Sequence, residues 1–95
     1  MDFKSEYHLV LFITGASPNS VRAISNIKSI CEKYLKGNYV LEIIDVYKNP
    51  GIAQKEQIIA LPTLIKKKPE MERRLVGDMS ETEKVLRGLG IFHKD

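Results

Sequence analysis

Residues 7–20 read YHLVLFITGASPNS, and this stretch carries the two signals that decide the fold. Its first part, up to Thr14, is an almost continuous apolar run that is too short for a helix and stops at Gly15, which is typical of a central strand covered on both faces. A helix is expected to begin directly afterwards. The Ser17 side chain can accept a hydrogen bond from the free amides of a first helical turn, and Pro18 fits the first helical position.

The predicted helix continues to about Gly37 and leads into a second strand. Residues 39–47 are again rich in β-branched and aromatic side chains, broken only by Glu42 and Asp45, which predicts a second covered strand. A right-handed helical crossover would place this strand parallel to the first, so that the first half forms a βαβ unit. The apolar side chains that recur at three- and four-residue spacing, and are expected to face the sheet, are Val21, Ile24, Ile27, Cys31 and Leu35.

The middle of the chain predicts a second helix and then a hairpin. An Asn-Pro pair at 49–50 repeats the cap-then-proline signal and predicts a helix to about Ile58. The run from Ile58 to Leu61 could equally be helix or extended strand. Two short apolar stretches, Thr63–Ile65 and Met71–Val76, are separated by a turn that contains lysine and proline. These stretches are predicted to pair as a hairpin at a sheet edge.

Residues 80–83, SETE, form a capping box in which side chains and amides at a helix start bond reciprocally. They predict a last helix with Val85, Leu86 and Leu89 facing inward. The element order then becomes βαβαββα, which is the order of an α/β, thioredoxin-like domain. We expect one such domain over residues 1–95, flexible at 1–6 and 93–95.

Composition and charge agree with one globular domain that is mildly basic. The chain has 95 residues and a formal net charge of +3 at pH 7. Residues 66–74, KKKPEMERR, hold the whole positive excess. No signal segment is evident, and the longest apolar run, Leu9–Ile13, is too short to cross a membrane, so we expect a cytoplasmic protein that does not enter a membrane.

The sequence does not favour an enzyme, a metal protein or a cofactor protein. In thioredoxin-like enzymes a thiolate sits between the first strand and the first helix, but the turn here, GASPNS at 15–20, has no cysteine. Ser17 is interpreted as a helix cap, and Cys31, the single cysteine, as a small buried side chain. His8 and His93 lack partners at metal-ligand spacing, so no metal site is predicted.

The basic segment 66–74 is the best functional candidate that the residues offer. Its charges could steer an acidic protein surface, contact nucleic-acid phosphates, or keep an edge hairpin from pairing with other chains. Nucleic acid is disfavoured because Glu70 and Glu72 interrupt the segment and no exposed aromatic side chain is interleaved to stack on bases. Pro62 is a separate feature: a proline that opens the third strand of this topology is expected to follow a cis peptide bond.

Four separated segments resemble the KaiB family of circadian-clock proteins, and the resemblance extends over nearly the whole chain, from Tyr7 to Leu89. None of these segments is a generic motif, which makes the joint match specific. The segments are TGASPNSVRA at 14–23, IIDVYKNP at 43–50, LPTLIK at 61–66 and RRLVGDMSETEKVLRGLG at 73–90.

The resemblance implies a non-enzymatic regulator that binds the ATPase ring of a KaiC-type partner and modulates its phosphorylation cycle, in clock or stress signalling, together with sensor histidine kinases. It also implies a metamorphic second half, which alternates between the thioredoxin-like arrangement and a ground state that self-associates as dimers or tetramers. Matched position by position, the partner-contacting residues are Arg22, Lys66 and Arg74, and the switch-region glycine is Gly88.

Two other interpretations compete with this one. The chain could be a thioredoxin-like interaction adaptor that is independent of KaiC, or a redox protein that uses Cys31. Binding to a KaiC-type hexamer distinguishes the first of these alternatives from the family function.

Overall fold

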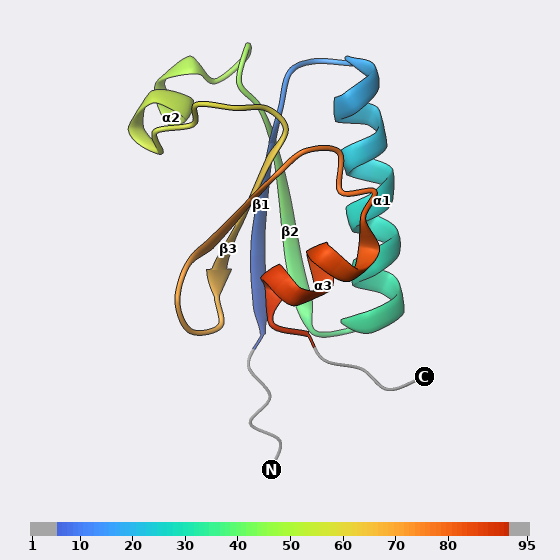
Figure 1. Cartoon of the computed structure of the whole chain (residues 1–95). Coiled ribbons are helices and arrows are strands. Elements are labelled where there is room, and N and C mark those ends of the chain that lie inside the picture. The colour runs from blue at the N-terminus through green and yellow to red at the C-terminus, as the bar shows by residue number, and fades with distance from the viewer. Residues whose placement is uncertain (1–5, 92–95) are drawn as a thin grey trace.

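The computed structural model describes residues 6–91 and has the predicted thioredoxin-like architecture, a four-stranded sheet with helices on both faces (Figure 1). The strand order is β2-β1-β3-β4. Within the described residues, no helix is both long and apolar enough to span a membrane. The elements are β1 (Tyr7–Ile13), α1 (Pro18–Tyr34), β2 (Tyr39–Asp45), α2 (Pro50–Lys55), β3 (Thr63–Lys68), β4 (Arg73–Val76) and α3 (Thr82–Leu89).

The first half forms the predicted βαβ unit. Strands β1 and β2 are parallel, in a register that runs from Tyr7 opposite Tyr39 to Ile13 opposite Asp45. Helix α1 begins as predicted, because the Ser17 hydroxyl accepts a hydrogen bond from the Ser20 amide at 3.2 Å. The sheet continues with β3 antiparallel to β1 and with β4 antiparallel to β3.

The two faces of the sheet are covered unequally. Helices α1 and α3 pack on one face, where alternate residues of β1 (Leu9, Leu11 and Ile13) join the larger core cluster. Among the described helices, the short α2 alone lies on the side of the other face, near one end of the sheet. The smaller cluster on that face, around Phe12 and Ile65, is packed partly by Ile58 and Leu61 of the segment after α2. The apolar run of β1 is continuous because both faces of this strand are buried.

Two burial predictions for the first half are wrong. Strand β2 is not a covered strand but an edge strand, because β3 pairs on the other side of β1, and Val40 is 45% exposed. Val21 does not face the sheet either: its side chain is 53% exposed. The other four predicted positions are correct: Ile27, Cys31 and Leu35 are buried, and Ile24 is partly buried against the core. The inward stripe of α1 begins at Ser20 and Ala23 rather than at Val21.

The second helix is shorter than predicted. It ends at Lys55 rather than near Ile58, and Gln57 adopts a left-handed backbone conformation with φ 57°, which an α-helix cannot continue through. The run from Ile58 to Leu61 therefore belongs to neither a helix nor a strand. The predicted side-chain cap is also wrong, because the Asn49 side chain donates to the Asp45 carbonyl at 3.1 Å instead of capping the helix.

The predicted hairpin is confirmed, with β4 as its edge strand and β3 inside the sheet. The Leu61–Pro62 peptide bond before β3 is cis, as predicted. A second cis bond, Lys68–Pro69, lies in the turn between β3 and β4 and was not predicted.

The last helix forms without the predicted capping box. Its N-cap is Glu81, which makes no side-chain capping bond. The Ser80 amide instead donates to a carboxylate oxygen of Asp78 at 3.0 Å, so the residues before the helix are organised by the preceding aspartate. The inward positions were predicted correctly, since Val85, Leu86 and Leu89 are buried.

Candidate partner-binding surface

The turn between β1 and α1, where a thioredoxin-like enzyme holds its thiolate, contains a closed network of hydroxyl groups. The Ser17 hydroxyl donates to Ser20 Oγ at 2.8 Å, and the Thr14 amide donates to the same oxygen at 3.0 Å. Ser20 is fully buried. These groups bond to one another and to the first turn of the helix, which is the structural role predicted for Ser17.

Cys31 is fully buried inside α1. Burial, with a smaller contribution from the charge of Glu32, raises the pKa of this thiol to about 12. The thiol therefore remains protonated near neutral pH, and the thiolate is the form that attacks disulfides and binds metals. No group of three or more candidate metal ligands occurs in the part of the chain that the structure describes.

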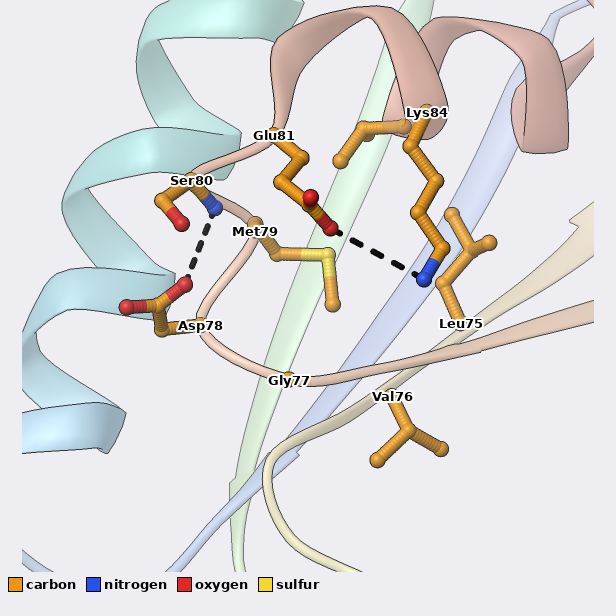
Figure 2. Close-up of a pocket in the computed structure, with 9 residues that line it drawn as sticks. Leu75, Val76, Gly77, Asp78, Met79, Ser80, Glu81 and Lys84 are labelled. Atoms are coloured by element: carbon orange, nitrogen blue, oxygen red, sulfur yellow. Dashed lines mark hydrogen bonds and ion pairs between the residues drawn. The ribbon is translucent and has the colours of Figure 1, made fainter.

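Arg22 lies on the exposed side of α1, near the start of the helix. Its Nε donates to Asp78 Oδ2 at 3.1 Å, and a terminal nitrogen donates to the Asn19 side chain. Figure 2 shows Asp78 on the side of its loop that faces the neighbouring helix, which is α1. Asn26, one turn further along α1, donates to the Asp78 carbonyl at 2.9 Å.

Asp78 thus connects the second half of the molecule to the first. Hydrogen bonds from the Ser80 side chain and amide, and then the bond from Arg22, lower the pKa of its carboxyl group. No sequence signal pointed to Asp78, because an aspartate in a loop has no periodic pattern and its partners on α1 are far from it in the chain.

Arg74 lies on the other face of the sheet, against the end of α2. Its terminal nitrogens donate to the Glu56 carbonyl at 2.7 Å and to the Gln57 carbonyl at 3.3 Å. Lys67 is in the same charged network, 3.0 Å from a Glu56 carboxylate oxygen and 3.6 Å from one of Glu72. Lys67 and Arg74 are thus both paired with the carboxylates of Glu56 and Glu72.

Lys66 is buried, with only 5% of its surface exposed. Its ammonium group donates to the Pro69 carbonyl and, at 2.7 Å, to the Met71 carbonyl. The lysine therefore holds the turn between β3 and β4 from the inside.

The structure does not bring Arg22, Lys66 and Arg74 together. Side chains alternate between the faces of a strand, so Lys66 lies on the α1 and α3 face while Lys67, its neighbour, lies on the α2 face. Arg74 is the register partner of Ile65 and shares the α2 face with it. The period of two along the lysine run would have revealed this division of the basic segment.

Gly88 lies inside α3 where the helix meets β4. A Cβ atom at this position would overlap Cδ2 of Leu75, and would lie 3.0 Å from Cδ1 and 3.1 Å from Cγ of the same side chain. The absence of a side chain therefore permits the close approach of α3 to β4.

Comparison with known proteins gives a consistent result. The KaiB domain family matches residues 10–91. The circadian clock oscillator protein KaiB of Rippkaea orientalis is 45% identical over 95 residues, which covers 100% of this chain and 91% of the relative. KaiB1 of Synechocystis is 45% identical over 93 residues, 98% of this chain and 89% of the relative.

Solved structures agree on the fold. The N-terminal domain of SasA from Synechococcus elongatus superposes with a TM-score of 0.75 at 18% identity, covering 100% of this chain and 92% of that one. Mitochondrial thioredoxin 3 from Saccharomyces cerevisiae gives a TM-score of 0.69 at 17% identity, covering 86% and 77%. At these identities the similarity shows the thioredoxin-like fold alone.

Proposed function

The chain belongs to the KaiB family, and from this premise we propose that it is a non-enzymatic regulator that binds the ATPase ring of a KaiC-type partner and modulates its phosphorylation cycle. The observation that carries the proposal is identity of about 45% along the whole chain to circadian clock oscillator proteins. The buried, protonated Cys31 thiol and the hydroxyl network at the first turn support a role in binding rather than in redox chemistry.

Arg22 and Arg74 are the cations that we propose to contact the partner directly. Both guanidinium groups lie at the surface and are bound to carboxylates of this chain, at Asp78 and at Glu56 and Glu72. Acidic groups on the partner would compete for the same donors. Such exchange of ion pairs gives specificity and a fast, salt-sensitive association more than bulk affinity.

Lys66 is the third residue that we propose for the partner contact, and it differs from the two arginines because the residue is almost fully buried and its ammonium group bonds to backbone carbonyls. It fixes the turn that carries the neighbouring exposed cations.

Rearrangement and self-association of the second half are proposed together with this function. Gly88 and Pro62 belong to the second half, which we propose to rearrange into a self-associating dimer or tetramer. The remaining proposals are a cytoplasmic location, a sensor histidine kinase as a further partner, action in clock or stress signalling, and one domain over residues 1–95.

Binding to a purified KaiC-type hexamer, measured by pull-down and by biolayer interferometry, tests the proposal. We expect Arg22→Glu and Arg74→Glu each to weaken binding by about tenfold or more, since each change places a carboxylate against acidic groups of the partner. Lys28→Glu is the matched control, because Lys28 is exposed on the same helix as Arg22 and the change in charge is equal.

Two results would contradict the proposal at different points. Equal losses for all three variants would refute the assignment of the contact residues. A folded wild-type protein that does not bind the hexamer would refute the proposed partner, and would favour an adaptor that acts without KaiC.

A further inference from the structure

A groove of about 400 Å³ lies between the turn that joins β3 to β4 and the C-terminal end of α3. Three cationic side chains from three elements line it, Lys66 of β3, Arg73 of β4 and Arg87 of α3. Lys66 and Arg73 are register partners, so their side chains lie on the same face of the hairpin. Gly88, next to Arg87, lets α3 come close enough to bring the third cation to this face.

These cations are less neutralised than the others of the chain that are described above. Arg22, Lys67 and Arg74 each form an ion pair with a carboxylate. Among residues 6–91, the guanidinium groups of Arg73 and Arg87 form no hydrogen bond or ion pair.

Lys66 also retains capacity to bind. Its ammonium group has three N–H donors, and within the described part of the chain two carbonyls accept from it. Those two bonds fix the nitrogen in place at the wall of the groove, so that little entropy remains to be lost when a third acceptor arrives.

The charge of the groove is strongly positive. Glu70 is the one carboxylate among the described lining residues, against three cations. Glu70 lies near Tyr7, whose pKa is raised first by burial and then by the Glu70 charge. Like charges gathered at one place repel one another, and an anion that enters the groove would relieve this repulsion.

The walls of the groove suit an acidic side chain that is carried on a protein segment. The turn contributes two carbonyl groups that accept from Lys66, and the adjacent end of α3 is the negative end of its dipole, so the attraction for an anion comes from the three cationic side chains. Pro69 and Met71, the latter 71% exposed, add apolar surface for the residues that flank an acidic side chain.

We propose that this groove receives an Asp or Glu side chain from a segment of the protein partner, held by the guanidinium groups of Arg73 and Arg87 over the Lys66 ammonium. The proposal rests on the proposed function and adds a second contact point, apart from Arg22 and Arg74. Arginine forks match the two oxygens of a carboxylate, which makes such a contact selective as well as attractive.

The experiment compares two variants of equal charge in binding to the KaiC-type hexamer. We expect Arg73→Glu/Arg87→Glu to lose about tenfold or more in affinity and to bind with a weaker dependence on salt. Lys28→Glu/Lys84→Glu is the control, because both lysines are exposed and lie outside the groove. Arg73→Lys/Arg87→Lys should give an intermediate loss, since charge is kept and the fork is removed.

Two outcomes would overturn the inference while the proposed function stands. Equal losses for the two charge-reversed double variants would show a general effect of charge. Altered self-association of the Arg73→Glu/Arg87→Glu variant with unchanged hexamer binding, measured by sedimentation, would assign the groove to contacts between copies of the chain.

If the wild-type protein does not bind the hexamer, the proposed function fails and the groove is tested separately. Amide NMR shifts would be followed while a short peptide with one Glu flanked by leucines, or its Gln counterpart, is added. Shifts confined to residues 66–73 and 87–90 with the Glu peptide support the inference. No shifts, or equal shifts with inorganic phosphate, overturn it.

Discussion

Gly88 decides the distance between α3 and β4. A glycine inside a helix ordinarily lowers stability relative to alanine by about 1 kcal/mol. Here, however, the helix axis lies so close to β4 that a methyl group would meet three carbons of one leucine, Leu75. The whole Leu75 side chain would have to move to relieve these contacts, because they include Cγ as well as both Cδ atoms. The local preference for alanine and the tertiary contact therefore oppose each other at this residue.

We expect Gly88→Ala to destabilise the protein by about 1 kcal/mol, because overpacking costs about 1–3 kcal/mol and the gain in helix propensity offsets part of it. In a Leu75→Ala background the same change should become stabilising, since the methyl group then has space. Urea unfolding of the four proteins measures both effects. The same destabilisation in both backgrounds would refute the contact as its cause.

The elements of the second half depend on contacts outside themselves. Helix α2 has no buried residue, and α3 begins without a side-chain cap. The loop before α3, drawn in Figure 2, is held instead by Asp78, whose carboxylate accepts from Ser80 and Arg22 and whose carbonyl accepts from Asn26. The position of α3 is thus set partly by α1.

Replacing Asp78 by asparagine tests this connection, because asparagine can still accept from the Ser80 amide but carries no charge. The pKa of Asp78 is lowered in the folded protein from the ordinary 3.8, so the charge stabilises the fold above that value and ceases to do so as the pH falls through the folded pKa. We expect Asp78→Asn to be less stable than wild type at pH 7, with the difference disappearing in acid. Urea unfolding at the two pH values measures it.

Arg22→Gln supplies the control for this ion pair. In that background the effect of Asp78→Asn should be smaller at pH 7, because the Arg22 partner is already absent. An unchanged effect would show that Ser80 alone accounts for the stabilisation.

At the scale of the whole molecule, burial is concentrated in α1, β1 and β3, and the buried face of α3 joins the same larger core. The short α2 lies outside this core, on the thinly covered face, and α3 packs next to the edge strand β4 (Figure 1). Elements with little buried surface open at lower free energy than the core. The protein is therefore unevenly stable, with its weakest helix in the half that we propose to rearrange.

Native-state hydrogen exchange should reveal this order. We expect the opening free energy of the α2 amides to be at least about 1 kcal/mol lower than that of the β1 and α1 amides, which exchange through global unfolding. The α3 amides should have an intermediate opening free energy. The measurement is amide exchange followed by NMR in low urea. Equal opening free energies for α2 and β1 would contradict the expected division.

Much of the fold was predictable because its signals are local. Ser17 and Pro18 mark the start of α1, the run from Tyr7 marks a doubly covered strand, and the hairpin follows from two apolar stretches around a proline-containing turn. The failure at the start of α3 was also local in origin. The capping box around Ser80 satisfied a sequence rule, but Asp78 competed for the same amide.

The candidate site was less predictable than the fold. The basic excess at 66–74 was visible in the sequence, and the period of two along a strand separates Lys66 from Lys67. Which cations of β4 share a face with each lysine depends on strand register. The burial of Lys66 under its own turn gave no sequence signal at all, since a lysine is ordinarily exposed.

By itself the sequence determined the order of the elements, the family, and the absence of a thiol at the turn where a thioredoxin-like enzyme would carry one. These properties depend on residue identity and on spacing along the chain. The tertiary structure alone decided that β2 is an edge strand, that Asp78 binds α1, and that Lys66, Arg73 and Arg87 meet in one groove. The reason is physical: these contacts join residues far apart in the chain, and the packing of α3 on the sheet brings them within reach of one another.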